Sequence, residues 1–131
     1  MATRSYIGKL TDEGTVNYIY CHYDGYLEHN GKLLKENYNT PEMVDELLSL
    51  GDISYLGEQI GQQQDFENPV KGYTIAYGRD RGEVDIEQRE SLLEDFGNDM
   101  GIDYFYLYTD EGWKYREDEF QTWKLIELEN N

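Results

Sequence analysis

The residues whose types are best suited to chemistry stand close together in the first third of the chain. Cys21, His22, Asp24 and His29 are types that bind metal ions or form a nucleophile with its base. A structural zinc site needs four nitrogen or sulfur ligands, and neighbouring residues of a strand point to opposite faces. The alternative is a buried Cys beside a His that is bonded to the backbone or to Asp24. We therefore expect no metal, no cofactor and no catalytic residue here.

A second set of polar residues lies in the segment Gly78-Arg79-Asp80-Arg81-Gly82-Glu83. Guanidinium groups suit the binding of phosphate or carboxylate, but the acidic neighbours favour internal ion pairs that shape a loop. Together with His22 and Asp24, Arg79 and Arg81 define a hypothetical small-ligand site. No P-loop or dinucleotide fingerprint accompanies them, because the nearby glycines lack the spacing and the following helix that those motifs require.

The charge of the chain is its strongest global feature. The formal net charge is −17, and the part after Gly82 holds 4 basic and 15 acidic residues, a balance of −11. Like charges repel one another and destabilise the compact state. DNA and RNA are excluded as direct partners, because binding them depends on Lys and Arg that neutralise phosphates. The natural complement is a basic protein surface.

The predicted partner-binding surface consists of carboxylates of the last third. They are Glu87, Glu90, Glu94, Asp95, Asp99, Asp103, Asp110, Glu111, Glu117, Asp118 and Glu119. On a helix, residues three and four apart lie about 5–6 Å from each other at Cβ, a spacing comparable with phosphates along a nucleic acid strand. Such a surface suits a channel lined by Arg and Lys, with Tyr104, Tyr106, Tyr108, Trp113 and Tyr115 as apolar anchors. The alternatives are the solvated face of a merely soluble acidic protein and, less specifically, the paired carboxylates of a hydrolase.

Alternating and helical patterns predict the elements of the first half. Residues 4–10 and 15–21 form a hairpin around a Thr-Asp-Glu-Gly turn. A short helix is expected over 31–38. A clearer helix begins after Thr40, a good N-cap that is followed by Pro, and ends at Gly51.

The second half is predicted to begin with a long connection, with one helical turn near 53–56. A strand over 72–78 and a polar loop over 79–82 follow. A helix over 86–96 begins with a capping box of Asp85 and Gln88. The remaining strands are expected over 102–108, which is apolar on both sides and hence central, over 113–115 and over 120–128.

This order of elements predicts an α+β domain spanning 1–131. It contains an antiparallel or mixed sheet of five to six strands with two to three helices packed on one face. The turn at 109–112 repeats the tetrapeptide Thr-Asp-Glu-Gly of the first hairpin, through an old duplication or through reuse of good turn chemistry. A single Cys, the lack of an apolar N-terminal segment and the lack of a long apolar run favour a soluble cytoplasmic protein without a membrane partner.

Several segments resemble a family of small phage and prophage proteins, most of which have no assigned activity. The segments are the opening Met-Ala-Thr-Arg-Ser-Tyr-Ile-Gly, the signature Cys21-His22-Tyr23-Asp24-Gly25-Tyr26, the blocks 47–52 and 76–83, and Phe105-Tyr106-Leu107-Tyr108 with Gly112-Trp113. In the family an aromatic residue, often Trp, stands where Tyr23 is here. The resemblance implies a mobile-element context, in which small acidic proteins often inhibit host nucleases as anti-CRISPR or antirestriction proteins.

The first hypothesis is a non-enzymatic, phage-type inhibitor that binds the basic nucleic-acid-binding surface of a host defence nuclease inside the infected bacterium. The alternative is a small-ligand or metal-binding protein, or a weak hydrolase, that uses His22, Asp24 and Arg79. A third interpretation is an assembly role as a homodimer through an aromatic edge strand.

Overall fold

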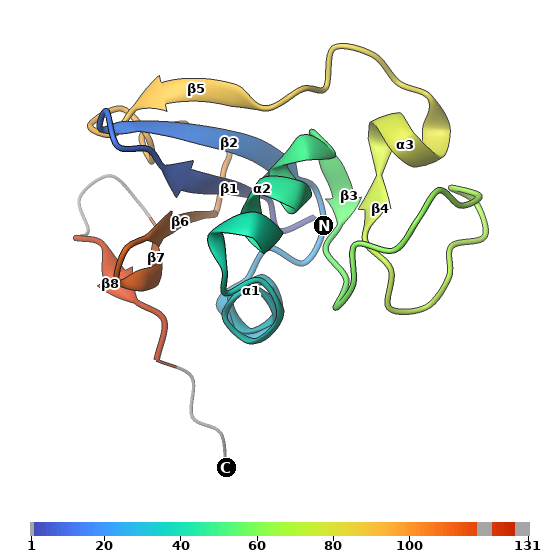
Figure 1. Ribbon diagram of the computed structural model, residues 1–131, viewed down its shortest axis with the longest axis horizontal. Helices are drawn as coiled ribbons and strands as arrows, with labels where there is room; N and C mark the ends of the chain where they lie inside the picture. Colours follow the sequence, from blue (N-terminus) through green and yellow to red (C-terminus); the bar gives the residue numbers. More distant parts are fainter. Residues whose placement is uncertain (1, 118–121, 128–131) are drawn as a thin grey trace.

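The computed structural model describes residues 2–117 and 122–127, which form a mixed α+β fold (Figure 1). The strands are β1 (Ser5–Leu10), β2 (Thr15–Cys21), β3 (Ile53–Tyr55), β4 (Ile75–Ala76), β5 (Arg89–Leu92), β6 (Tyr104–Thr109), β7 (Gly112–Arg116) and β8 (Lys124–Leu125). The helices are the π-helix η1 (Leu27–Gly31), α1 (Lys32–Asn37), α2 (Pro41–Ser49) and α3 (Tyr77–Arg81). The strands form one 8-stranded mixed sheet in the order β4-β3-β2-β1-β6-β7-β8, with β5 paired to β2.

Two hairpins form the centre of the sheet. Strands β1 and β2 pair antiparallel, as do β6 and β7, which confirms both predicted hairpins. Strands β1 and β6 lie side by side and run parallel, with Lys9 opposite Tyr108. Strand β6 therefore lies between β1 and β7, in the central position that its apolar residues predict. The turns of the two hairpins consequently lie at the same end of the sheet.

The alternation of side chains along β1 and β6 builds a core on each face of the sheet. On one face, Ile7 and Tyr106 are fully buried together with Leu34 of α1 and Leu47 of α2. On the other face, Phe105 belongs to a smaller apolar cluster that includes Phe96. Helices α1 and α2 thus cover one face, and the segment after β5 covers part of the other.

Helix α2 forms as its sequence predicts. The side chain of Thr40 accepts a hydrogen bond from the Met43 N–H at 3.2 Å, and Pro41 occupies the first turn. Gly51 follows with φ of 74°, a conformation that favours glycine. The predicted helix over 31–38 is also present, but it begins earlier, as the π-helix η1.

The signature segment Cys21–Tyr26 turns the chain from β2 into the helical layer. A Cβ added to Gly25 would lie 2.8 Å from the Ser5 Cβ and 2.8 Å from the Thr3 carbonyl oxygen, so only glycine fits without a shift of the backbone. The Gly25 N–H donates to the Thr3 carbonyl at 2.8 Å, and the Gly25 carbonyl accepts from the Tyr106 hydroxyl at 2.6 Å. Gly25 therefore has a structural role between the start of β1 and β6.

The predicted helix over 86–96 is wrong. Residues 89–92 form strand β5, which pairs antiparallel with the first half of β2, Thr15 opposite Leu92 and Tyr18 opposite Arg89. Asp85 has φ of 62°, so it does not cap a helix. The free edge of β2 offers unpaired backbone groups, and that long-range pairing prevails over the local helical pattern.

Four further predictions change along the same edge and at the end of the sheet. The helical turn near 53–56 is strand β3, and the predicted strand over 72–78 narrows to β4 before the chain enters α3, where a loop was expected. The last predicted strand, 120–128, is β8 over Lys124–Leu125, while 120, 121 and 128 lie outside the described residues. The sheet therefore has eight strands where five to six were predicted. Within the described ranges, no helix is long and apolar enough to cross a membrane.

Asp52 joins the elements that meet beyond the C-terminal end of α2. Its carboxylate Oδ1 accepts from the Tyr20 N–H at 2.9 Å and from the Arg89 guanidinium at 3.0 Å. Its own N–H donates to the Ile86 carbonyl at 2.7 Å. One aspartate thus holds β2 and the segment that leads into β5.

We predict that Asp52→Ala destabilises the protein by about 2 kcal/mol, because hydrogen bonds to a charged group contribute about 1.5–3 kcal/mol and the Tyr20 N–H is left without its acceptor. Urea unfolding measures the change. The matched control Asp12→Ala, at an exposed turn, is expected to stay within about 0.5 kcal/mol of the parent protein. Equal midpoints for the parent and Asp52→Ala would contradict this role.

Candidate protein-binding surface

Three turns rich in carboxylates lie at one end of the sheet. The turns of both hairpins lie there because β1 and β6 run parallel. The segment after β5 joins them, since β5 runs antiparallel to β2 and the Leu93 N–H donates to the Gly14 carbonyl at 3.4 Å. Figure 1 shows the tip of β5 beside the turn between β1 and β2, at the left of the view. The two copies of Thr-Asp-Glu-Gly are therefore neighbours in space.

We call the carboxylates of this end the turn-end acidic surface. Its members are Asp12, Glu13, Glu90, Glu94, Asp95, Asp110 and Glu111, all of them exposed. In the part of the chain that the structure describes, one member, Glu111, forms an ion pair, with the Lys114 ammonium at 2.7 Å. The hydrogen bond from Lys114 also lowers the pKa of Glu111. Nearby Lys9 binds Asp45 at 2.8 Å, so it does not neutralise the turns.

The other predicted carboxylates are not part of this surface. Asp103 lies just before β6 and accepts from the Arg4 N–H at 2.9 Å, at the opposite end of β1. Asp99 is hydrogen-bonded to Tyr6, and burial together with this bond raises the pKa of that tyrosine. Glu87 precedes β5, and Glu117 follows β7, which again places both away from the turns. Asp118 and Glu119 lie outside the described residues.

The structure adds two members that the charge pattern of the last third did not suggest, Asp12 and Glu13. The signal that could have found them was present in the sequence as the repeated tetrapeptide Thr-Asp-Glu-Gly. The repeat predicted two similar turns, but their position at the same end of the sheet depends on the parallel pairing of β1 with β6. The helical spacing predicted for Glu87, Glu90 and Glu94 is wrong. Glu90 belongs to strand β5, and Glu87 and Glu94 flank it.

Two of the aromatic residues predicted as partner anchors belong to the core. The Tyr106 hydroxyl donates to the Gly25 carbonyl, and the Trp113 indole donates to the Tyr38 carbonyl at 2.7 Å; both side chains are buried. Tyr108 is half-buried, and its hydroxyl contacts the Asn39 carbonyl at 3.4 Å. Tyr106 and Trp113 therefore hold the sheet against the helices and do not face a partner.

Arg79, one of the predicted ligand-binding residues, forms its hydrogen bonds with groups of the protein itself. Its guanidinium donates to the Ile60 carbonyl at 2.8 Å, to the Thr74 carbonyl at 2.7 Å and to the Asp80 carboxylate at 2.9 Å. The Asp80 side chain is fully buried. Burial opposes its ionisation, but the bonds from Arg79 and from backbone N–H groups outweigh burial and lower the pKa of Asp80. This is the internal ion pair that was the alternative interpretation of this loop.

The other members of the predicted ligand set have separate partners. Arg81 pairs with Glu83 and lies over the rings of Phe66 and Tyr77. The Nδ1 atom of His22 is 2.6 Å from the Tyr20 hydroxyl, so the partner of this ring nitrogen is neither a backbone group nor Asp24. Among the described residues, no hydrogen bond or ion pair joins Arg79 or Arg81 to His22 or Asp24, and no group of three or more His, Cys, Asp or Glu side chains could hold a metal ion.

Cys21 is fully buried, beside polar groups of the core. Its thiol donates to the Tyr23 carbonyl and accepts from the Asn30 amide, each at 3.4 Å. Burial raises the pKa of the thiol to about 11, although these hydrogen bonds oppose the shift. A neutral, enclosed thiol is a poor nucleophile.

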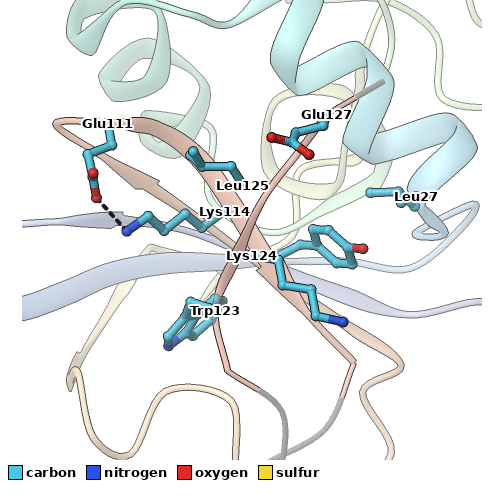
Figure 2. Close-up of a pocket in the computed structure, with 8 residues that line it drawn as sticks. Leu27, Glu111, Lys114, Trp123, Lys124, Leu125 and Glu127 are labelled. Atoms are coloured by element: carbon cyan, nitrogen blue, oxygen red, sulfur yellow. Dashed lines mark hydrogen bonds and ion pairs between the residues drawn. The ribbon is translucent and has the colours of Figure 1, made fainter. Parts of the chain in front are cut away.

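A surface hollow of about 610 Å³ lies along β7 and β8 (Figure 2). Its wall includes Lys114, Trp123, Lys124 and Leu125, and the Glu111–Lys114 ion pair spans one side of the view. The described lining contains no Ser, Cys or His. This described lining therefore offers no nucleophile–base pair built from Ser, Cys or His.

Comparison of the chain with family models, with curated proteins and with solved structures finds no match. The turn-end acidic surface therefore has to be interpreted from its own chemistry.

We predict that Cys21 resists alkylation by iodoacetamide in the folded protein, because the reagent needs an exposed thiolate and this thiol is buried and protonated at about pH 8. Mass spectrometry should show labelling in denaturant and none under native conditions. Rapid native labelling would show that the thiol is accessible and would reopen the nucleophile interpretation.

Proposed function

We propose that this chain is a non-enzymatic inhibitor that binds the basic nucleic-acid-binding surface of a host defence nuclease, as an anti-CRISPR or antirestriction protein does. The observation that supports the proposal is the turn-end acidic surface, in which three turns of a chain with net charge −17 present exposed carboxylates at one end of the sheet. A site that neutralises phosphates with Lys and Arg is complementary to such a surface. The action then takes place in the cytoplasm of an infected bacterium.

The anchoring of the two hairpin turns suits them to mimic a phosphate backbone. In the first turn, the Thr11 and Thr15 hydroxyls are 2.7 Å apart, and Thr15 also donates to Glu90 at 3.2 Å. In the second, the Thr109 hydroxyl accepts from the Glu111 N–H at 3.2 Å. Carboxylates on a fixed backbone lose little conformational freedom on binding, so charge-assisted hydrogen bonds to Arg and Lys retain more of their free energy.

The geometry gives less support to a hydrolase or small-ligand protein that uses His22, Asp24 and Arg79. The Arg79 guanidinium already binds two carbonyls and a buried carboxylate, and its side chain is 16% exposed. A homodimer through an aromatic edge strand would have to use β4, β5 or β8, because the tyrosine-rich strand β6 is interior to the described sheet. The turn-end acidic surface therefore supports a function better than the small-ligand site or the homodimer does.

We predict that the triple variant Glu13→Lys, Glu94→Lys and Asp110→Lys loses inhibition of its target nuclease while remaining folded. The change replaces three carboxylates of the acidic surface and moves the formal net charge from −17 to −11. The target is identified by capture from a nuclease-treated bacterial lysate and mass spectrometry, and inhibition is measured as cleavage of its DNA or RNA substrate.

The matched control is the triple variant Glu28→Lys, Glu58→Lys and Glu67→Lys, which has the same net charge but leaves the three turns intact. It should inhibit like the parent protein, and circular dichroism should show both variants folded. Equal loss of inhibition in both variants would mean that net charge matters and the three turns do not.

We also predict that binding to the captured nuclease weakens steeply between about 0.1 M and about 1 M salt, as the Debye length falls from about 10 Å to about 3 Å. A DNA or RNA oligonucleotide that the nuclease binds should displace the protein competitively. An interaction that is independent of salt, or one that forms equally well on the nucleic-acid-bound nuclease, would contradict the proposal.

A further inference from the structure

The chain that leaves β2 forms a π-helical turn, η1, which continues directly into α1. Turns of this kind are rare and occur frequently at functional sites. In η1, Asn30 is fully buried, where its amide Nδ2 donates to the Ser5 hydroxyl at 3.1 Å and to the Cys21 thiol at 3.4 Å. Both donor hydrogens of the amide face these two residues, so its Oδ1 is left as an acceptor on the other side.

This buried amide fixes the state of the neighbouring His29. The Asn30 Oδ1 lies 2.9 Å from His29 Nδ1, so Nδ1 carries the proton and donates it to that oxygen. The other ring nitrogen, Nε2, lies 3.1 Å from the Tyr55 hydroxyl. Burial and the negative charge of Asp24 raise the pKa of Tyr55, so its hydroxyl remains protonated and donates. His29 and Tyr55 therefore form a polar wall, and the hydrogen bonds that lead to the buried Asn30 fix its orientation.

His29 and Tyr55 line a cavity of about 540 Å³, which is the size of a small-molecule site. The cavity lies between η1 and α1 on one side and the backbone around Gly57 and Gly72 on the other. Charges of both signs surround it. They are the carboxylates of Glu28, Glu36 and Glu58 and the ammonium groups of Lys32 and Lys71.

Among the described residues that line this cavity, charges of opposite sign are not paired with one another. Lys9, Arg79 and Arg89 each form an ion pair with a nearby carboxylate. Within residues 2–117 and 122–127, no ion pair joins Lys32 or Lys71 to any carboxylate, although three carboxylates line the same cavity. Unpaired groups of opposite sign that face one cavity match a ligand that itself carries both signs.

We propose that this cavity binds a small zwitterion of the α-amino acid class. The carboxylate of the ligand contacts Lys71, and its ammonium group contacts Glu58, which lie on the side of the cavity formed by Gly57 and Gly72. The ligand packs against the fixed wall of His29 and Tyr55. The turn-end acidic surface contributes nothing to this site, so the cavity and the proposed inhibitor function can be tested separately.

The test is an NMR titration of the full chain, in which each common L-amino acid is added in turn and backbone amide shifts are followed. We expect at least one amino acid to give saturating shifts at Gly57 and Gly72. Acetate and methylammonium, which carry one charge each, should bind about tenfold more weakly or less, because each omits one charge-assisted contact. Saturation by no amino acid, or equal affinity for a single-charge probe, would overturn the proposal.

Two exposed substitutions make the test specific. Lys71→Met and Glu58→Gln each remove one charge, and each should weaken binding of the amino acid about tenfold. The matched control Lys124→Met removes an exposed lysine that lines the hollow beside β8, and it should leave the affinity unchanged. A loss with Lys71→Met alone would identify an anion site and contradict a zwitterionic ligand, as would equal losses in all three variants.

Discussion

Strands β1 and β6 lie side by side and run in the same direction, from Ser5 opposite Tyr104 to Lys9 opposite Tyr108. This pairing places two antiparallel hairpins in one orientation, so that both turns emerge at the same end. It also sets the two faces of the core, because Ile7 and Tyr106 point toward the helices while Phe105 points away. The acidic surface is a consequence of this pairing, since without it the two Thr-Asp-Glu-Gly turns would not be neighbours.

Local patterns predicted the elements whose partners are close in sequence. Alternation identified both hairpins, and Thr40 with Gly51 marked the limits of α2, because caps and turns act within a few residues. The segment around Glu90 was not predictable in this way. Its acidic residues fit a solvated helix, but the open edge of β2 recruits it as β5 over a separation of some 75 residues, as in the bond from Thr15 to Glu90. Likewise, the position of the two acidic turns at the same end of the sheet depends on a pairing that the sequence does not reveal.

The polar residues of the chain divide into two groups with different roles. The Cys-His-Tyr-Asp-Gly-Tyr segment and Arg79 looked suited to chemistry, but Cys21, Gly25 and Arg79 form hydrogen bonds with groups inside the protein. The exposed groups with unsatisfied charge lie elsewhere, at the turns and around the cavity of His29 and Tyr55. Residue type alone indicated chemistry, whereas burial and partners decide which residues are free to meet a ligand or a protein.

The central claim is that the three acidic turns form the contact surface for a basic partner. Hydrogen–deuterium exchange of the protein, free and in complex with its captured nuclease, tests this claim most directly. The account predicts slower exchange on binding in residues 11–14, 93–95 and 109–112, with little change around α3. Protection confined to the elements around β4 and α3, with unchanged exchange in all three turns, would contradict it.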